Sequence, residues 1–496
     1  MGQQQQHHAA EEPPATFYAP RVRVYPQAVK GKVRRLRWGV LWLLLGLYYL
    51  APWLRWDRGP GRPDQAFLAD MEHGRLFFLG LEIWPQEVYY VTGLLVLAAI
   101  GLFAVTCLAG RLWCGFACPQ TVWTDLFMWV ERRIEGDRNA RMRRDRKPRW
   151  SWDDRLRKAT KHVAWVLIAL ATGGAWVMYF TDAPTLLRDL ARGEASSTTL
   201  FFIGLFTATT YLLAGWAREQ VCTYMCPWPR FQAAMLDEQS LVVSYRAWRG
   251  EPRGKPRDAA AGDCVDCAAC VHVCPTGVDI RDGQQLGCIS CGLCIDACDA
   301  VMQRLDRPQG LIAFDTLGNL ARAEAATAGM PRGAACRGAG LAVRQAPNPF
   351  RPRLLLYAAA LLVVGGAMLG GLLLREPVAL DMLRDRAPLF VRLSHGGIRN
   401  AYTLKIRDRR HEAAQLAIAA DGLPPGTQLS VSDAETDAAG RPLVATRADD
   451  VATLRLLVTA PAPLPAASTP VVIRLLDPRS GAEVARAENV FLGPQP

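Results

Sequence analysis

Eight of the fourteen cysteines form a single spaced quartet that occurs twice in the chain. The quartets are Cys264, Cys267, Cys270 and Cys274, and Cys288, Cys291, Cys294 and Cys298, with each residue 24 positions after its counterpart. This Cys-x2-Cys-x2-Cys-x3-Cys run, with a proline directly after the first quartet, is typical of bacterial ferredoxins that bind two [4Fe-4S] clusters. The spacing therefore predicts a protein that transfers electrons.

The same spacing assigns the ligands of the two predicted clusters. In two-cluster ferredoxins the fourth cysteine of each quartet ligates the cluster of the other quartet. Cluster 1 is therefore assigned Cys264, Cys267, Cys270 and Cys298, and cluster 2 is assigned Cys288, Cys291, Cys294 and Cys274. Two structural zinc sites are the alternative, but their usual spacing is two Cys-x-x-Cys pairs separated by a longer loop. We therefore expect two [4Fe-4S] clusters as cofactors, with iron as the bound metal.

Four other cysteines form two Cys-x3-Cys-Pro motifs. The first motif contains Cys114 and Cys118, and the second contains Cys222 and Cys226. Residues four apart share one face of a helix, so four thiols converge if the two motifs meet. Such soft ligands suit Cu(I), zinc or an iron-sulfur centre, whereas the alternative is that small buried cysteines pack between helices. The repetition favours a functional site, and no role is predicted for the isolated Cys107 and Cys336.

Apolar segments explain why the mean hydropathy is +0.05 although 21% of the residues are charged. A helix of about 20 apolar residues can cross a bilayer. The sequence predicts five membrane helices, at Trp38–Leu54, Val88–Gly110, Val163–Phe180, Thr198–Ala217 and Leu354–Leu374.

Lysine and arginine residues predict the orientation of these helices, because basic residues are retained on the cytoplasmic side of a membrane. They are dense before the first predicted span and between the second and third, and sparse between the third and fourth. We therefore expect the amino terminus and the quartets in the cytoplasm, and the chain after the fifth span on the outer side. The net charge of +12 is explained by these flanking residues and by membrane lipid, so we exclude nucleic acid as a partner.

The chain after the last predicted span has the pattern of an all-β domain. Short alternating stretches are separated by clusters of Gly, Pro, Asn and Asp, which mark turns. The predicted strands are Leu389–Leu393, Tyr402–Arg407, Gln415–Ala419, Thr427–Val431, Ala452–Val458 and Pro470–Leu476. About 120 residues of this kind predict an immunoglobulin-like sandwich. It has no cysteine for an inter-sheet disulfide and no catalytic constellation, so we expect a binding or docking role.

Together these parts predict a multi-domain membrane protein. Residues 1–37 form a basic cytoplasmic tail, and residues 38–217 form a membrane domain with four spans and both Cys-x3-Cys-Pro motifs. Residues 218–353 form a cytoplasmic region with a two-cluster ferredoxin-like domain at about 258–305, residues 354–374 form the fifth transmembrane helix, and residues 375–496 form the immunoglobulin-like domain. The small-residue segment around Cys336 is expected to be irregular.

The chain also resembles a known family. The resemblance is carried by both quartets, by both Cys-x3-Cys-Pro motifs, and by the segments Glu131–Arg138, Arg249–Gly254 and Asn400–Ile406, in the family's order. On these residues the chain resembles the cytochrome c oxidase accessory proteins called CcoG, FixG or RdxA. The Ala- and Gly-rich segment Leu317–Phe350 departs from the family, because it is longer than the usual link into the last span.

The resemblance implies a bacterial inner-membrane polyferredoxin with a periplasmic immunoglobulin-like domain. It implies reduction of Cu(II) to Cu(I) for assembly of a cbb-type haem-copper oxidase, with copper as substrate or bound ion and oxidase assembly factors as partners. A cytoplasmic donor would supply the electrons. The candidate copper-reduction site is Cys114, Cys118, Cys222 and Cys226. Two alternatives remain, namely a quinol-linked electron-transfer subunit for a periplasmic reductase and a non-enzymatic copper carrier or assembly scaffold.

Overall fold

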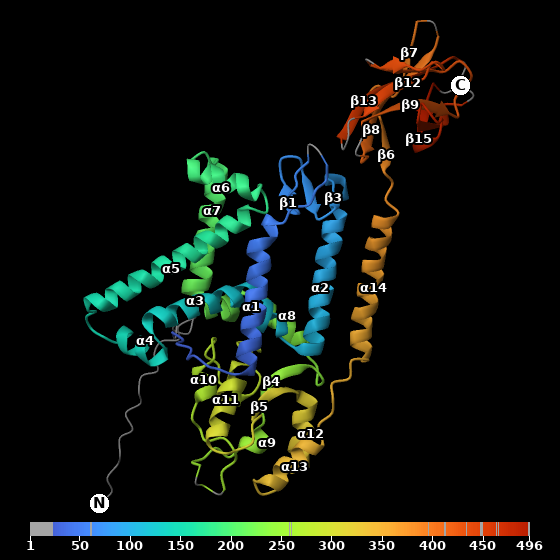
Figure 1. The fold of residues 1–496 in the computed structure, drawn as a ribbon. Coiled ribbons are helices and arrows are strands. Elements are labelled where there is room, and N and C mark those ends of the chain that lie inside the picture. The colour runs from blue at the N-terminus through green and yellow to red at the C-terminus, as the bar shows by residue number, and fades with distance from the viewer. Residues whose placement is uncertain are drawn as a thin grey trace, which may run out of the picture. The chain divides into compact units, whose positions relative to one another are not determined.

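The protein consists of two compact units, which divide between Met368 and Leu369. A computed structural model describes residues 23–59, 62–256, 258, 260–394, 396–410, 413–432, 434–446, 450–462, 464 and 466–494. Most of the predicted basic tail, residues 1–22, therefore lies outside the described residues. The first unit contains the long helices and all the cysteine motifs, and the second contains only strands and their connections beyond the end of a helix (Figure 1).

Helices make up most of the first unit before the quartets. They are α1 (Lys32–Leu50), α2 (Tyr89–Ala109), α3 (Pro119–Glu135), α4 (Arg138–Asp145), α5 (Trp152–Val177), α6 (Ala183–Arg192), α7 (Ser197–Thr210), α8 (Trp228–Met235) and the short α9 (Ala247–Gly250). A small antiparallel sheet of β1 (Phe67–Asp70), β2 (Arg75–Phe78) and β3 (Leu81–Ile83) separates α1 from α2. Pro119 begins α3, where its missing N–H would have no partner within the helix.

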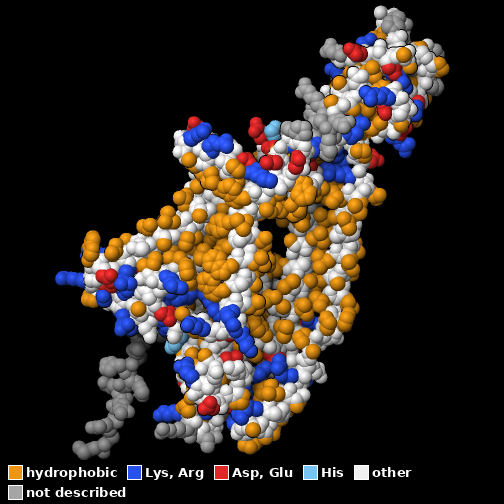
Figure 2. Space-filling view, in the orientation of Figure 1, with side chains coloured by type: hydrophobic (Ala, Val, Ile, Leu, Met, Phe, Trp, Pro, Cys, Tyr) orange, Lys and Arg blue, Asp and Glu red, His pale blue; other side chains and the backbone are white. Residues whose placement is uncertain are grey.

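Three helical segments of the described chain are long and apolar enough to cross a membrane. They are Pro85–Ala109, Ser197–Ala217 and Pro352–Leu373, and the last of these is α14. Few of their side chains are buried, and Figure 2 shows hydrophobic side chains covering the helical part of the first unit in a broad belt. The other two predicted spans overlap α1 and α5 and extend a few residues beyond the carboxyl end of each helix, and the first turns of both helices carry charged residues. Those two spans remain predictions.

The two ferredoxin quartets fold as an internal repeat. The first loop leads into α10 (Ala269–His272) and the second into α11 (Leu293–Arg304). Equivalent positions of the two loops have left-handed backbone conformations, with φ of 52° at Asp266 and at Ser290, 53° at Ala268 and 70° at Gly292. Strands β4 (Leu241–Tyr245) and β5 (Ile312–Thr316) pair antiparallel and close the segment at its two ends. The 24-residue repeat of the sequence is therefore also a repeat of backbone conformation.

The amino end of α1 contacts the second ferredoxin helix. Asp296 of α11 accepts hydrogen bonds from the backbone N–H groups of Val33 (3.2 Å) and Arg34 (2.7 Å). The first N–H groups of a helix have no partner within it, and the helix dipole favours a negative charge there. This carboxylate therefore attaches the ferredoxin segment to the first long helix of the same unit.

Two helices occupy the segment that was expected to be irregular, so that prediction was wrong. They are α12 (Leu317–Thr327) and α13 (Ala334–Ala342). Alanine has the highest helix propensity, and it outweighs the scattered glycines of this segment. Cys336 is buried in α13, in a cluster with Trp248 and Ala323. Its surroundings indicate a packing role.

The second unit is a sandwich of two antiparallel sheets, as predicted. One sheet has the order β10 (Gln428–Val431), β13 (Asp450–Ala460), β8 (Ile398–Asp408) and β6 (Val378–Arg384), with β7 (Val391–Arg392) also on β8. The other has the order β11 (Glu435–Thr436), β12 (Pro442–Thr446), β9 (Ala414–Asp421), β14 (Ser468–Leu476) and β15 (Glu483–Leu492). Each of the six predicted strands overlaps an observed one, but β6, β11, β12 and β15 were missed.

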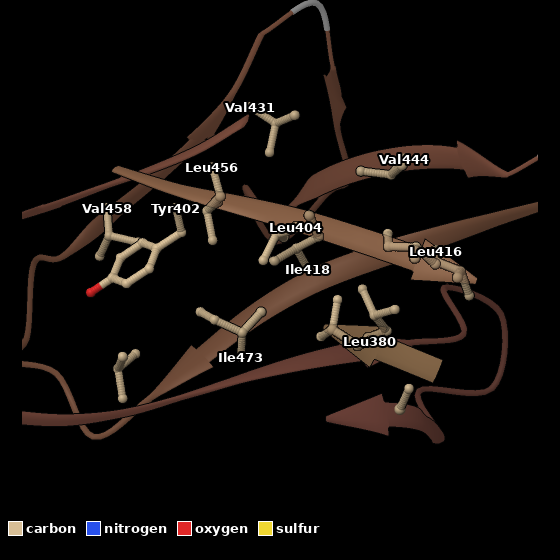
Figure 3. Close-up of a cluster of buried hydrophobic side chains, with 14 of the residues drawn as sticks. Leu380, Tyr402, Leu404, Leu416, Ile418, Val431, Val444, Leu456, Val458 and Ile473 are labelled. Atoms are coloured by element: carbon tan, nitrogen blue, oxygen red, sulfur yellow. The ribbon is translucent and has the colours of Figure 1, made fainter. Parts of the chain in front are cut away.

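The core of the sandwich lies between the two sheets. Figure 3 shows Leu404, Ile418 and Ile473 among the buried side chains that fill it, and each of these three is 0% exposed. Two polar side chains of β8 reach across to β15. Asn400 donates to the Leu492 carbonyl at 2.7 Å and accepts from its N–H, and the Tyr402 hydroxyl donates to the Val490 carbonyl at 2.9 Å. These bonds lock the two sheets together without a disulfide.

Candidate functional site

The eight ferredoxin cysteines line two neighbouring cavities. The first cavity is lined by Cys264, Cys267, Cys270 and Cys298. The second is lined by Cys274, Cys288, Cys291 and Cys294, and Cys270 reaches it as well. The last cysteine of each quartet therefore lies at the cavity of the other quartet, as in the ligand sets assigned from the spacing. The role of each thiol as an iron ligand remains a prediction.

The residues around both cavities fit an iron-sulfur cluster. The first cavity is lined by four cysteines and the second by five, and in both they come from the two quartets, so that sulfur can be offered from several directions. Burial raises the pKa of Cys270 to about 11 and that of Cys298 to about 12, so a metal must displace a proton to gain a thiolate. An all-cysteine set of four is the usual ligand set of a [4Fe-4S] cluster, so the residues present fit that group.

The structure also brings the two Cys-x3-Cys-Pro motifs together. Cys114, Cys118, Cys222 and Cys226, which we call the membrane-proximal quartet, line one cavity of about 320 Å³. The cavity wall is mostly apolar and includes Trp113, Trp228 and Ile289. Burial raises the pKa of Cys114 to about 12, and the nearby thiols of the other three cysteines act in the same direction. The predicted convergence of four sulfurs is thus a feature of the tertiary structure.

Each motif is built on a single π-helical turn. The turns are Trp113–Ala117 and Val221–Met225, and each is closed by a bond from the second cysteine's N–H to the carbonyl five residues earlier, at 2.8 Å in both. π-helical turns are uncommon and often lie at functional sites. Three residues before each turn the backbone is left-handed, at Gly110 (φ 59°) and at Arg218 (φ 44°). The two motifs therefore repeat in conformation as well as in sequence.

The first motif packs directly against the loop Ile289–Cys291, which lies at the second ferredoxin cavity. A Cβ atom at Gly115 would lie 2.8 Å from the Ile289 carbonyl oxygen and 2.9 Å from that of Ser290. Only a residue without a side chain allows this approach. Arg111 connects the second ferredoxin loop to the start of α8. Its guanidinium donates to the Cys288 carbonyl at 2.9 Å and to the Pro229 carbonyl at 2.8 Å. The membrane-proximal quartet and the second ferredoxin cavity are therefore neighbours.

Replacing Gly115 with alanine should separate these two loops. The added methyl group overlaps two backbone carbonyls that cannot rotate away, so we expect a loss of about 1–3 kcal/mol in the free energy of unfolding. Thermal unfolding of the purified protein measures this. Gly174→Ala is the matched control, since a Cβ at this helical glycine meets nothing within 4 Å. Equal melting temperatures of the two variants would contradict the tight packing at Gly115.

A buried ionic network holds the second motif in place. Glu131 of α3 pairs with Arg218 at 3.0 Å, with Arg141 at 2.7 Å and with Lys161 at 3.6 Å. Burial alone would raise the pKa of Glu131, but these cations outweigh it and hold that pKa at about 2. Arg218 also donates to the Gly215 carbonyl at 2.7 Å, which helps to fix its left-handed backbone. The network thus connects α3, which follows the first motif, to the turn that carries Cys222.

Several residues at this site were missed by sequence reasoning. Arg111, Arg218 and Gly115 were not considered, and Glu131 was noted only within a family motif. Gln232 of α8, which is 0% exposed, accepts a hydrogen bond from the Cys114 thiol at 3.1 Å. Comparing residues 109–119 with residues 217–227 would have shown the repeat at a spacing of 108. No pattern in the sequence identified which residues pair with Arg111, Arg218 or Glu131.

The fold and the cysteine cavities define a membrane-associated iron-sulfur electron-transfer protein with an immunoglobulin-like domain at its carboxyl end. Family models agree with each part. A 4Fe-4S dicluster domain matches residues 217–317, a 4Fe-4S binding domain matches residues 91–136, and the immunoglobulin-like fold at the carboxyl terminus of FixG matches residues 368–494.

The similarity to individual proteins shows to which family the chain belongs. The chain is 49% identical to the nitrogen fixation protein FixG of Rhizobium meliloti (strain 1021) over 461 residues, which cover 90% of this chain and 88% of that protein. It is 47% identical to the protein RdxA of Cereibacter sphaeroides over 482 residues, which cover 96% of this chain and 98% of that protein. It is 25% identical to the ferredoxin-type protein NapH of Escherichia coli over 306 residues, which cover 50% of this chain and 90% of that protein. The chain belongs to the FixG/RdxA family.

Proposed function

We propose that this protein is a cupric reductase that converts Cu(II) to Cu(I) for assembly of a cbb-type cytochrome c oxidase. The observation that carries the proposal is the contact between the second ferredoxin cavity and the membrane-proximal quartet, at Gly115 and Arg111. An electron that leaves the second ferredoxin cavity therefore reaches a set of soft sulfur ligands, of the kind that suits Cu(I) or an iron-sulfur centre. Copper is the substrate of this reaction.

The arrangement of the cavities suggests an order for electron transfer. Iron-sulfur clusters, when bound, pass single electrons. The first cavity contains the exposed Cys267, which suits entry of electrons from a cytoplasmic donor. The second cavity contains Cys291 beside the Gly115 contact, which suits exit toward the membrane-proximal quartet. Arg111 keeps the exit loop in position by binding the Cys288 carbonyl.

We further propose the membrane arrangement that accompanies this function. Five spans, with α1 and α5 in addition to the three apolar helices, would place the amino terminus and the ferredoxin segment in the cytoplasm of a bacterium. The basic flanks of α1 and α3 would contact lipid head groups at the inner membrane. The immunoglobulin-like domain would then lie in the periplasm, where it can dock oxidase assembly factors.

The direct test uses the purified protein under anaerobic conditions. After chemical reduction of the clusters and removal of the reductant, addition of Cu(II) should restore the oxidised cluster absorbance while Cu(I) forms, one ion for each electron released. A Cu(I)-specific chelating dye follows the product. Clusters that stay reduced in the presence of Cu(II) would refute the proposed activity.

A quinol-linked electron-transfer subunit is the second candidate. The combination of two Cys-x3-Cys-Pro pairs with a two-cluster segment favours it, whereas the immunoglobulin-like domain at residues 368–494 favours the first candidate. Oxidation of quinol by the isolated protein without copper would support this second function. A copper carrier or scaffold with purely structural clusters is the third reading, and clusters that cannot be cycled between oxidation states would support it.

A further inference from the structure

We infer that the membrane-proximal quartet, Cys114, Cys118, Cys222 and Cys226, holds a third iron-sulfur cluster. All four cysteines line one cavity, and no other cysteine lines it among the residues that the structure describes. An all-cysteine set of four is the usual ligand set of both [2Fe-2S] and [4Fe-4S] clusters. The quartet therefore has the chemistry of a cluster site as well as that of a copper site.

The size of the quartet cavity suits an iron-sulfur cluster. The quartet cavity of about 320 Å³ is roughly ten times the volume of a water molecule in the liquid. Several metal and sulfide ions can occupy such a space.

The origin of the four thiols also matches a cluster. Two come from the turn Trp113–Ala117 and its end, and two from the turn Val221–Met225 and its end. Both turns are closed by the same type of hydrogen bond, and in both the residue three positions before the turn has a left-handed backbone conformation. They therefore offer two sulfurs from each of two segments, which is the arrangement that a cluster with four ligands needs.

Two independent observations point to the same group. The family model described as a 4Fe-4S binding domain matches residues 91–136, which contain Cys114 and Cys118 and none of the eight ferredoxin cysteines. The Cys114 loop also packs on the Ile289–Cys291 loop, so a cluster at the quartet would continue the line of redox centres toward the membrane.

The inference rests on the proposed function only for the final acceptor of the electrons. Each Cu(II) ion would take one electron at the quartet and leave as Cu(I), with no bond formed and no proton transferred. The ferredoxin clusters would replace that electron from the cytoplasmic donor. The thiols would thus stay bound to iron, and copper would react beside them.

The test is the iron and acid-labile sulfide content of the full-length protein, purified without oxygen and without added copper. We expect about 12 iron and 12 sulfide per chain for three [4Fe-4S] clusters, or about 10 of each if the third is [2Fe-2S], and about 8 of each would overturn the inference. Replacing all four quartet cysteines with serine should lower the content to about 8. The double variant Cys118→Ser, Cys226→Ser should do the same with less disturbance of the fold.

Cys107→Ser is the matched control, because Cys107 is 0% exposed and lies near the quartet but does not line its cavity. It should keep the full iron content and the low-temperature paramagnetic spectrum of the reduced protein. Unchanged iron in the quartet variants, or one copper ion in place of the extra iron, would overturn the inference. Full iron content without any reduction of Cu(II) would leave the third cluster in place and refute the cupric reductase activity instead.

Discussion

Replacing Cys288 with serine is expected to remove cluster 2 and to stop the reduction of Cu(II). Cys288 lies in the cavity next to the membrane-proximal quartet, and its carbonyl is bound by Arg111. Loss of one [4Fe-4S] cluster removes about four iron atoms per chain, with the matching part of the visible absorbance and of the low-temperature paramagnetic signal. Iron analysis and electron paramagnetic resonance measure the loss, and a Cu(I) chelator measures the activity.

The companion variant Cys264→Ser should lose a similar amount of iron and keep more of the activity. Cys264 belongs to the other cavity, so a small chemical reductant can still supply cluster 2 directly in this variant. Cys336→Ser is the control, because this buried thiol packs against Trp248 and lines neither cavity. Equal activity of the Cys264 and Cys288 variants would contradict the proposed order of the two clusters.

Replacing Glu131 with glutamine is expected to give the largest loss of stability. The carboxylate is 1% exposed and pairs with Arg218, Arg141 and Lys161. Its removal leaves three buried cations without their shared partner, and breaking a buried ion pair in this way costs about 3–5 kcal/mol. Denaturant unfolding in detergent measures the change. Iron bound at the membrane-proximal quartet should fall as well, because Arg218 fixes the turn that carries Cys222.

The pH dependence of stability provides a second readout for Glu131. The pKa in the folded protein is about 2, below the ordinary value of 4.5. The ionised carboxylate therefore stabilises the fold fully above about pH 4.5, and this contribution is lost as the pH falls toward 2. The glutamine variant should lack this part of the acid dependence. Asp153→Asn, at an exposed ion pair on α5, is the control and should change stability by less than about 1 kcal/mol.

The ferredoxin quartets and the sandwich were predictable because their signals are local. A cluster loop needs cysteines at fixed short spacings, and a strand with one buried face needs alternating residues, so both patterns can be read within a few residues. The strands β6, β12 and β15 were missed because their alternation is weak in isolation, and pairing within the sheets stabilises them. The helices α12 and α13 were missed because their segment was described only by its Ala- and Gly-rich composition, although alanine has the highest helix propensity.

The sequence by itself determined that the chain carries two ferredoxin-type quartets, two further cysteine pairs, apolar helices and an all-β domain. The tertiary structure alone decided that the two pairs share one cavity, that Gly115 places this cavity against the cluster 2 loop, and that Glu131 binds cations from three separate segments. Two of these contacts join residues far apart in the chain, namely Arg111 with Cys288, which are 177 positions apart, and Glu131 with Arg218, which are 87 positions apart. Spacing along a chain carries no information about such pairs, because only the packing of helices brings them within hydrogen-bond distance.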